Sequence, residues 1–346
     1  MTRPVKKALI VSAALAAASF ALLLAVRLFP ALSTAAKAFS ASFSGLLGAL
    51  FSLAPLHLGE LLFFALFPVL IALCVMACVR RRVALFFSRL LAFALGFLLF
   101  FNAVWGVCYF VPPLSEEHSF SEQQLSATAE SYFRMASELA PQMPRDEQGH
   151  LSSPDLEELA TQSASLLSAS PLSRRKQISP PKGLLSSPLF TAQGITGIYD
   201  PFTGECAVNT QTPATDLPFV CLHELFHRLG TAREDEANFL AILAAVSSED
   251  PAFRYSGALM GALYCWSGLS SQTRTDLLAS ASPELLRDIK DRNAVLQSFS
   301  GPAADAHDAA NDLYLRLYGD PSGVRSYGEV TDLLIAYRLG LFDPLA

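Results

Sequence analysis

Long runs of apolar residues dominate the first third of the chain and do not recur after it. Three of these runs, at about residues 8–28, 61–79 and 90–111, contain almost no charged residue. A helix rises ~1.5 Å per residue, so about 20 apolar residues cross a hydrocarbon core of ~30 Å. The pattern therefore predicts three transmembrane helices within a membrane region that covers residues 1–111.

A fourth apolar run, residues 38–56, is uncharged but contains four serines, two glycines and Pro55. Its larger side chains recur at helical spacing, from Phe39 through Leu46 to Leu53. This combination is typical of an amphipathic helix that lies in the membrane interface rather than crossing the bilayer.

The positions of basic residues decide between three and four spans. Arg3, Lys6 and Lys7 place the N-terminus in the cytoplasm under the positive-inside rule. Three spans keep the arginines at 80–82 in the cytoplasm as well, whereas four spans would place them outside. We therefore expect a multi-pass protein of the cell membrane, with residues 112–346 forming an extracytoplasmic domain.

Charge separates the two parts of the chain. Residues 1–111 carry nine Lys and Arg but one acidic residue, Glu60, whereas residues 112–346 carry sixteen basic and thirty acidic residues. The acidic second part excludes the basic surface that binding of nucleic acid needs.

The apolar runs hold no ionisable residue away from their ends, which disfavours a transporter. The first run is longer than the apolar core of a usual signal peptide, so we expect it to remain as an anchor.

The second part combines helical patterns with one predicted hairpin. Ser119 with Glu122 offers a capping box for a helix to about residue 140, and Ser153-Pro154 opens another to about residue 168. Two strands, 195–199 and 205–209, flank the turn-rich Asp-Pro-Phe-Thr-Gly. We predict an α+β fold that is mostly α, with a small sheet. Further helical patterns cover residues 256–269, 283–298, 304–318 and 327–339.

The three cysteines of this part, Cys206, Cys221 and Cys265, are an odd number and indicate no disulfide framework.

The strongest chemical signal is a His-Glu-x-x-His motif directly after the predicted hairpin. On a helix, His223 and His227 lie one turn apart on a single face. Two imidazoles so placed can hold two corners of a zinc tetrahedron, and Glu224 can act as the base that deprotonates water. The motif alone is suggestive, because a chain of this length contains it by chance in roughly one case in a hundred.

An ordinary surface pair is the alternative interpretation, in which Arg228 pairs with Glu224 one turn away. Apolar residues surround the histidines, however, and burying unpaired imidazoles is costly. Gly230 suits a left-handed helix stop, and Thr231 with Glu234 matches a capping box for a second helix at about residues 232–246. A carboxylate from Glu234, in the first turn of that helix, would complete a two-His, one-Glu zinc site.

The segment from Glu234 through Asn238 resembles the Glu-x-x-Ala-Asp/Asn helix of gluzincin metallopeptidases. This resemblance implies that Glu234 is the third zinc ligand and that Asn238 supports a ligating histidine. Arg233 stands where the metzincin pattern has its third histidine, which argues against that branch. The short gap after His227 leaves Glu236 as an alternative ligand. The two acids lie about 200° apart on a helix, so only one can face the histidines, and Glu234 is nearer to them.

A wider resemblance covers nearly the whole chain. It rests on residues 105–115, 194–204, 223–241, 253–257 and 323–327. The chain is similar to a bacterial family catalogued as domain of unknown function 3810, membrane-anchored proteins with a zincin-like domain. The resemblance implies that strand 205–209 is the sheet edge beside the metal, where an extended peptide can pair. It also makes Tyr255, Arg325 and Tyr327 candidates for stabilising an oxyanion or contacting substrate, although a core tyrosine is the commoner role.

Together these patterns predict a membrane-anchored zinc metallopeptidase of gluzincin type that hydrolyses peptide or protein substrates outside the cytoplasm. Zn²⁺ is its expected cofactor, and the lipid bilayer and the peptide are its expected partners. The alternative is a non-catalytic zincin-fold module that binds or assembles components of the cell envelope. An intact Glu224 disfavours that alternative, because a structural zinc site needs no base.

Overall fold

The computed structural model describes the whole chain except residues 117, 174, 319–326 and 346. Two compact units make up the fold. The N-terminal unit consists of Met1–Pro112 together with the short segment Asp200–Glu205. The C-terminal unit consists of Pro113–Tyr199 and Cys206–Ala346. The sequence pattern gave no sign that residues 200–205 group with the first unit.

The N-terminal unit is helical. Among its described residues, three helices are long and apolar enough to cross a membrane: α1 (Arg3–Leu28), α3 (Leu58–Val79) and α4 (Val83–Val104). The number agrees with the prediction, but the third helix is shifted. It begins before Arg89 and ends at Val104, because the chain leaves the α-helix at Trp105 and continues as the 3₁₀ helix η1 (Gly106–Phe110). An arginine is tolerated in α4 because it lies near the helix end, where its long side chain can reach the membrane surface.

Helix α2 (Pro30–Phe51) covers much of the fourth apolar run but starts earlier and ends earlier than predicted. Pro30 occupies its first position, where a missing N–H costs nothing. Its buried side is made of small residues, Ser33, Ser40, Ser44 and Gly48, whereas several of its large side chains, Leu32, Phe39, Leu46 and Leu50, are exposed. This separation of small and large residues gives an amphipathic helix, and its placement in the membrane interface stays a prediction.

The segment Asp200–Glu205 is held by contacts inside the N-terminal unit. The Phe202 ring stacks on the Phe97 ring of α4, with ring centroids 4.0 Å apart. The Glu205 carboxylate accepts hydrogen bonds from the backbone N–H groups of Leu58 and Gly59, at 3.3 and 3.0 Å. These groups open α3, so Glu205 satisfies N–H donors that have no partner within the helix and also complements the helix dipole.

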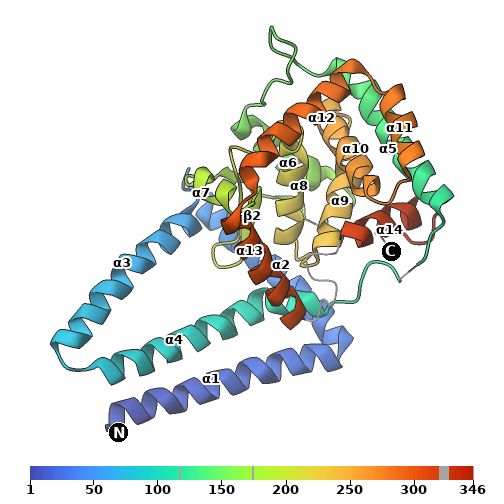
Figure 1. Ribbon diagram of the computed structural model, residues 1–346. Coiled ribbons are helices and arrows are strands. Elements are labelled where there is room, and N and C mark those ends of the chain that lie inside the picture. The colour runs from blue at the N-terminus through green and yellow to red at the C-terminus, as the bar shows by residue number, and fades with distance from the viewer. Residues whose placement is uncertain (117, 174, 319–326, 346) are drawn as a thin grey trace. The chain divides into compact units, whose positions relative to one another are not determined.

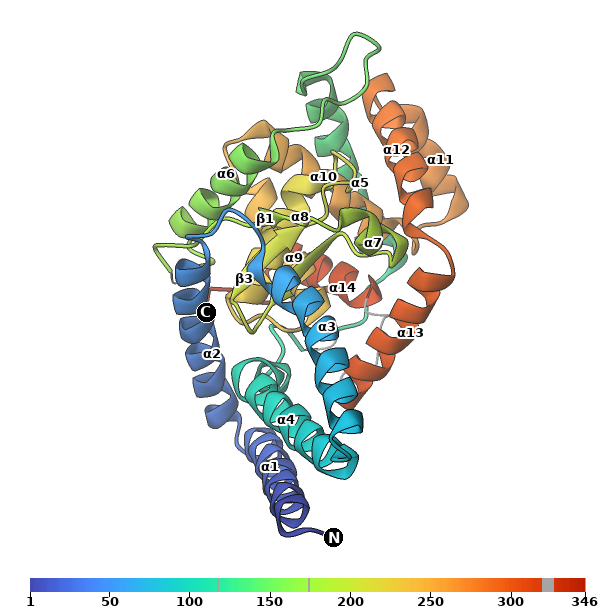
Figure 2. The same cartoon turned by 90° about the vertical axis from the view of Figure 1, so that its left-hand side faces the viewer.

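The C-terminal unit is mostly helical, in agreement with the predicted fold class. Helices α8, α9 and α10 lie at its centre, and α10 packs against both α9 and α5. Figure 2 shows α6 and the α11–α12 pair on opposite sides of this centre. The helices are α5 (Glu122–Leu139), α6 (Leu156–Ala169), α7 (Ser187–Ala192), α8 (Leu217–Arg228), α9 (Glu234–Val246), α10 (Pro251–Trp266), α11 (Ser271–Ser280), α12 (Pro283–Leu296), α13 (Pro302–Leu317) and α14 (Tyr327–Arg338), with 3₁₀ turns at Ala140–Gln142 and Gln297–Phe299.

A three-stranded sheet precedes the motif helix, as predicted. Its strands are β1 (Lys182–Gly183), β2 (Gly197–Asp200) and β3 (Glu205–Val208), in the order β1-β3-β2, with β1 parallel to β3. The neighbours β2 and β3 form the predicted hairpin, which the bond from Asn209 N–H to Thr196 C=O extends. The prediction of 205–209 as the sheet edge is wrong, because β3 is the central strand. Its neighbour β2 is an outer strand of the sheet among the described residues.

Two predicted helix starts are also displaced. Helix α5 is capped by Ser121 and Gln124, which exchange side-chain and backbone hydrogen bonds, instead of by Ser119 and Glu122. Helix α6 is capped by Asp155, which accepts from Glu158 N–H, instead of by Ser153. In both cases an equally good cap stands two residues further on, so composition alone could not choose between them.

Candidate metal centre

The motif helix α8 is buried on nearly every side. Pro218 lies in its first turn, and the apolar residues between Phe219 and Phe226 surround its polar side chains. Within this surround the polar side chains of Glu224, His227 and Arg228 are only 4–6% exposed. The Arg228 guanidinium donates to the Ser179 carbonyl at 2.8 Å, and it makes no ion pair with Glu224 among the described residues. The interpretation of the motif as an ordinary surface pair is therefore excluded by burial.

The turn after α8 orients His227. Gly230 has φ 91°, the left-handed conformation predicted for the helix stop. The turn brings the Thr231 carbonyl back to the helix, where it lies 2.7 Å from His227 Nδ1. A carbonyl can only accept, so Nδ1 carries the proton and the lone pair of a neutral His227 lies on Nε2. Such a backbone contact is a common way to orient a metal-binding imidazole.

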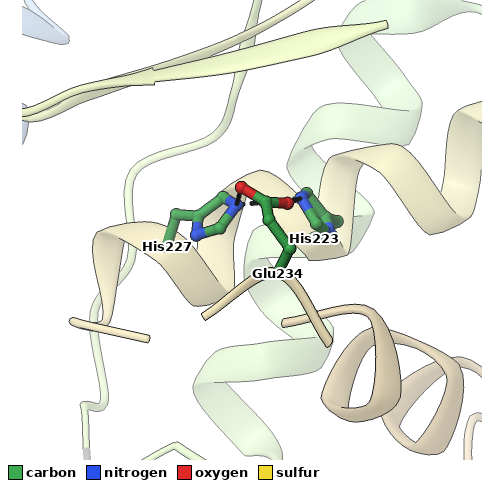
Figure 3. A group of neighbouring side chains, drawn as sticks. All are labelled: His223, His227 and Glu234. Atoms are coloured by element: carbon green, nitrogen blue, oxygen red, sulfur yellow. Dashed lines mark hydrogen bonds and ion pairs between the residues drawn. The ribbon is translucent and has the colours of Figure 1, made fainter. Parts of the chain in front are cut away.

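The predicted capping box at the start of α9 is absent. The N-cap of α9 is Arg233, with no side-chain cap, and the Glu234 carboxylate instead turns toward the histidines. The expected box failed because the Thr231 backbone is engaged with α8, as its N–H also donates to Phe226 C=O at 3.1 Å. Glu234 is thus available for the cluster in Figure 3.

Three side chains converge at this point: His223, His227 and Glu234. The two Nε2 atoms are 2.9 Å apart. His223 Nε2 lies 3.3 Å from one Glu234 oxygen, and His227 Nε2 lies 3.5 Å from the other. Among the described residues this is the only group of three or more His, Cys, Asp or Glu whose possible ligand atoms all lie within 4.8 Å of one another.

These separations fit a tetrahedral zinc site. Ligand atoms about 2.0–2.1 Å from zinc in a tetrahedron are about 3.3 Å from one another. The two distances between histidine and Glu234 atoms, 3.3 and 3.5 Å, are close to this value, and the two Nε2 atoms are closer together, at 2.9 Å. The Nε2 atoms of His223 and His227 face each other, and a neutral His227 has its lone pair on Nε2. The Glu234 side chain is 36% exposed, so the cluster is reachable from solvent.

Charge interactions reinforce the cluster. Burial acts to raise the pKa of Glu234, but His227 and His223 outweigh burial and hold that pKa well below its usual range. Burial acts to lower the pKa of His227, but the Glu234 carboxylate outweighs it and raises the pKa to about 9. These shifts keep Glu234 ionised beside the histidines, and a metal cation that bound here would displace the proton of His227.

Glu224 is not one of the three converging residues, and its carboxylate lies against Gly197 of strand β2. Burial raises its pKa, an effect that His223 and His227 partly offset. A Cβ atom at Gly197 of β2 would lie 2.5 Å from Glu224 Oε1, so only glycine leaves room for the carboxylate. On the neighbouring strand β3, the Cys206 thiol donates to the Glu224 backbone carbonyl at 3.1 Å. Because side chains point out of the faces of a sheet, Glu224 lies on one face of the sheet, against its outer strand β2.

The two acids that follow Glu234 face elsewhere. Glu236 accepts a hydrogen bond from Leu114 N–H at 3.0 Å and lies 3.9 Å from the Arg233 guanidinium. Asp235 is buried at 8% exposure, and its Oδ1 has no hydrogen-bond partner among the described residues. The structure therefore brings Glu234, and not Glu236, to the histidines, as the helix geometry predicts.

Asn238 does not support a histidine in this structure. No hydrogen bond joins it to His223 or His227 among the described residues. His223 Nδ1, the atom that Asn238 could support, is buried and has no hydrogen-bond partner among the described residues.

Of the candidate oxyanion residues, Tyr255 is the one whose side chain the structure describes, and it belongs to a different cluster. Tyr255 is 2% exposed, and its hydroxyl donates at 2.6 Å to Asp288 of α12, a core role that leaves nothing for a substrate. Arg325 and the Tyr327 side chain lie outside the described residues. Sequence reasoning missed Gly197 and Thr231. The glycine could have been suspected from its strand position, where glycine marks a close approach, but the Thr231 carbonyl carries no sequence signal.

Comparison with known families agrees with the wider resemblance. The family model described as "Protein of unknown function (DUF3810)" matches residues 36–335, so the chain belongs to that family. Neither a curated protein nor a solved structure matches this chain.

Proposed function

We propose that this protein is a membrane-anchored, zinc-dependent metallopeptidase of gluzincin type. The observation that carries the proposal is the convergence of His223, His227 and Glu234, with Glu224 buried beside them. Two helices and a left-handed turn at Gly230 bring these residues together. A His₂Glu donor set is the one that catalytic zinc uses in several peptidases, since it leaves a fourth position for water or substrate.

The chain's own residues account for the remaining chemistry. A bound zinc ion would polarise the substrate carbonyl and lower the pKa of water toward ~7. Glu224 would accept a proton from the attacking water, a role that its burial favours by raising its pKa toward the working range of a base. The same carboxyl group would then deliver that proton to the leaving amine. Thr231 would hold His227 in the ligating orientation through Nδ1.

The edge strand β2 offers a place for the peptide. Its Gly197 lies beside the Glu224 carboxylate, and β3 covers only its other edge. An extended peptide can add to such a free edge through backbone hydrogen bonds. Substrates in an extended, unfolded conformation are therefore the class that this arrangement favours.

The arrangement in the membrane is part of the proposal. We expect three spans, with the N-terminal residues Arg3, Lys6 and Lys7 and the arginines of the α3–α4 turn in the cytoplasm. The C-terminal unit then lies outside the cytoplasm. A reporter fused after Ser115 should therefore be external and one fused after Arg82 cytoplasmic. An external Arg82 would require α2 to span and would reverse the proposed sidedness.

Replacing Glu224 by Gln tests the activity. The amide keeps the size of the side chain and all three metal ligands but cannot accept the proton. We expect Glu224→Gln to retain zinc while hydrolysis of unfolded casein falls by about 10²–10⁴-fold. Glu249→Gln, the same change on an exposed residue after α9, should leave hydrolysis unchanged. Equal turnover by the Glu224→Gln variant and the parent would refute the peptidase proposal.

The second candidate, a non-catalytic module of the cell envelope, predicts zinc without hydrolysis. The position of Glu224 disfavours it, because a buried carboxylate with a raised pKa is costly and a structural zinc site gains nothing from it.

A further inference from the structure

A groove of about 490 Å³ runs between helices α3 and α4 of the N-terminal unit. Its walls are apolar and include Leu66, Leu73 and Met76 of α3 and Phe93 of α4. Its volume is within the range of ordinary ligand pockets, about 300–1,000 Å³. The groove lies on helices that are long and apolar enough to cross a membrane, so the medium around it is lipid.

One end of the groove is strongly basic. Arg80 and Arg82, in the turn between the two helices, and Arg89, on the second turn of α4, contribute to its lining. None of these three guanidinium groups makes an ion pair among the described residues. Glu60, the only acidic residue of positions 1–112, lies at the opposite end of α3. The basic end therefore lacks a counter-charge from the residues around it.

The length of the groove matches one leaflet. Ten residues of α3 separate Leu66 from Met76, a rise of ~15 Å. This distance is about half of a hydrocarbon core of ~30 Å. An apolar channel of this depth with cationic groups at one end is complementary to a single lipid, its acyl chains along the helices and its phosphate at the arginines.

We propose that this groove binds an anionic phospholipid, with Arg80, Arg82 and Arg89 contacting the headgroup. Basic pockets between transmembrane helices are recognised sites for anionic headgroups. The acyl chain fills the space that α3 and α4 leave between them. This site does not depend on the proposed peptidase activity.

Native mass spectrometry of the full chain in detergent tests the site. The probes are phosphatidylglycerol and phosphatidylcholine with identical acyl chains, added to delipidated protein. We expect phosphatidylglycerol to be retained preferentially. Arg89→Gln should weaken its retention about fivefold, the change that corresponds to about 1 kcal/mol for one basic residue at a membrane surface.

The matched control is Arg81→Gln, which removes the same charge from the same turn but does not line the groove. It should leave retention unchanged. Leu73→Trp, which narrows the apolar part without altering charge, should also weaken retention. Equal effects of Arg81→Gln and Arg89→Gln would show attraction by general charge and overturn the site.

Two further outcomes also contradict the proposal. Equal retention of phosphatidylcholine would show that the arginines do not select the headgroup. Displacement of the lipid by millimolar inorganic phosphate would show an anion site that needs no acyl chain. Because every readout is lipid binding, failure here leaves the metal site untouched, and failure of the metal site leaves this result untouched.

Discussion

Two buried polar clusters in the C-terminal unit differ in the chemical groups that they bring together. In one, Arg145 donates to both oxygens of Asp288 at 2.9 and 2.8 Å, and Tyr255 adds a third donor at 2.6 Å. In the other, His223 and His227 direct their Nε2 atoms at each other, and Glu234 stands 3.3–3.5 Å away. The first cluster is a closed hydrogen-bonded network, whereas the second has the spacing of a site around a cation.

The difference separates a structural role from a functional one. A buried charge is tolerated when its partners are hydrogen-bonded, as Asp288 is with its fully buried side chain. Tyr255 belongs to this closed network, and burial together with Asp288 raises its pKa far above the usual range, so it keeps its proton. The converging groups of the second cluster, His223, His227 and Glu234, are instead all possible metal ligands, which suggests a ligand role.

The largest expected effect comes from breaking the closed network. Asp288→Ala removes the only carboxylate that Arg145 pairs with among the described residues and the acceptor of the Tyr255 hydroxyl, which should cost about 3–5 kcal/mol of unfolding free energy. Thermal unfolding of the full chain in detergent should show a Tm lower by about 10 °C. Asp312→Ala, which removes an exposed ion pair with Arg316, should change Tm by less than about 2 °C. A comparable shift in the two variants would contradict the structural role of the first cluster.

The second prediction separates the two candidate acids at the metal. Glu234→Ala removes one of three protein ligands and should weaken zinc binding by about a hundredfold or more. Glu236→Ala removes an acceptor for Leu114 N–H and should weaken zinc binding by less than about tenfold. Competition with a fluorescent zinc chelator measures both. A larger loss in Glu236→Ala would mean that the ligand assignment is reversed.

Gly197→Ala tests the approach of strand β2 to the proposed base. The new methyl group would lie 2.5 Å from Glu224 Oε1, so the carboxylate must move while the three metal ligands stay in place. We expect kcat to fall about ten- to a hundredfold with zinc content unchanged. Gly96→Ala is the control, since its Cβ meets nothing closer than 3.7 Å. Normal kcat in Gly197→Ala would show that Glu224 does not need its present position.

The smallest effect is expected at Asn238. The resemblance to gluzincins implies that it supports a histidine, a role whose loss typically costs 10–100-fold in metal affinity. The structure shows no such hydrogen bond, so Asn238→Ala should change zinc affinity by less than about threefold. A loss beyond tenfold in the chelator competition would instead show that Asn238 reaches the unpartnered His223 Nδ1 once metal is bound.

Sequence patterns predicted the features that depend on local chemistry. The long apolar helices follow from hydropathy, the stop at Gly230 follows from its freedom at positive φ, and the pairing of His223 with His227 follows from helical periodicity. Features that depend on distant contacts were missed. The central position of β3 results from its pairing with β1, and the fate of Tyr255 results from Asp288, 33 residues away.

The metal content of the purified protein tests the central claim most directly. Full-length protein, prepared without chelator and analysed by inductively coupled plasma mass spectrometry, should contain about one zinc per chain. The double variant His223→Gln/His227→Gln should contain almost none while keeping its helical circular dichroism. Zinc-free parent protein that also fails to take up added zinc would contradict the account, as would equal zinc content in the parent and the double variant.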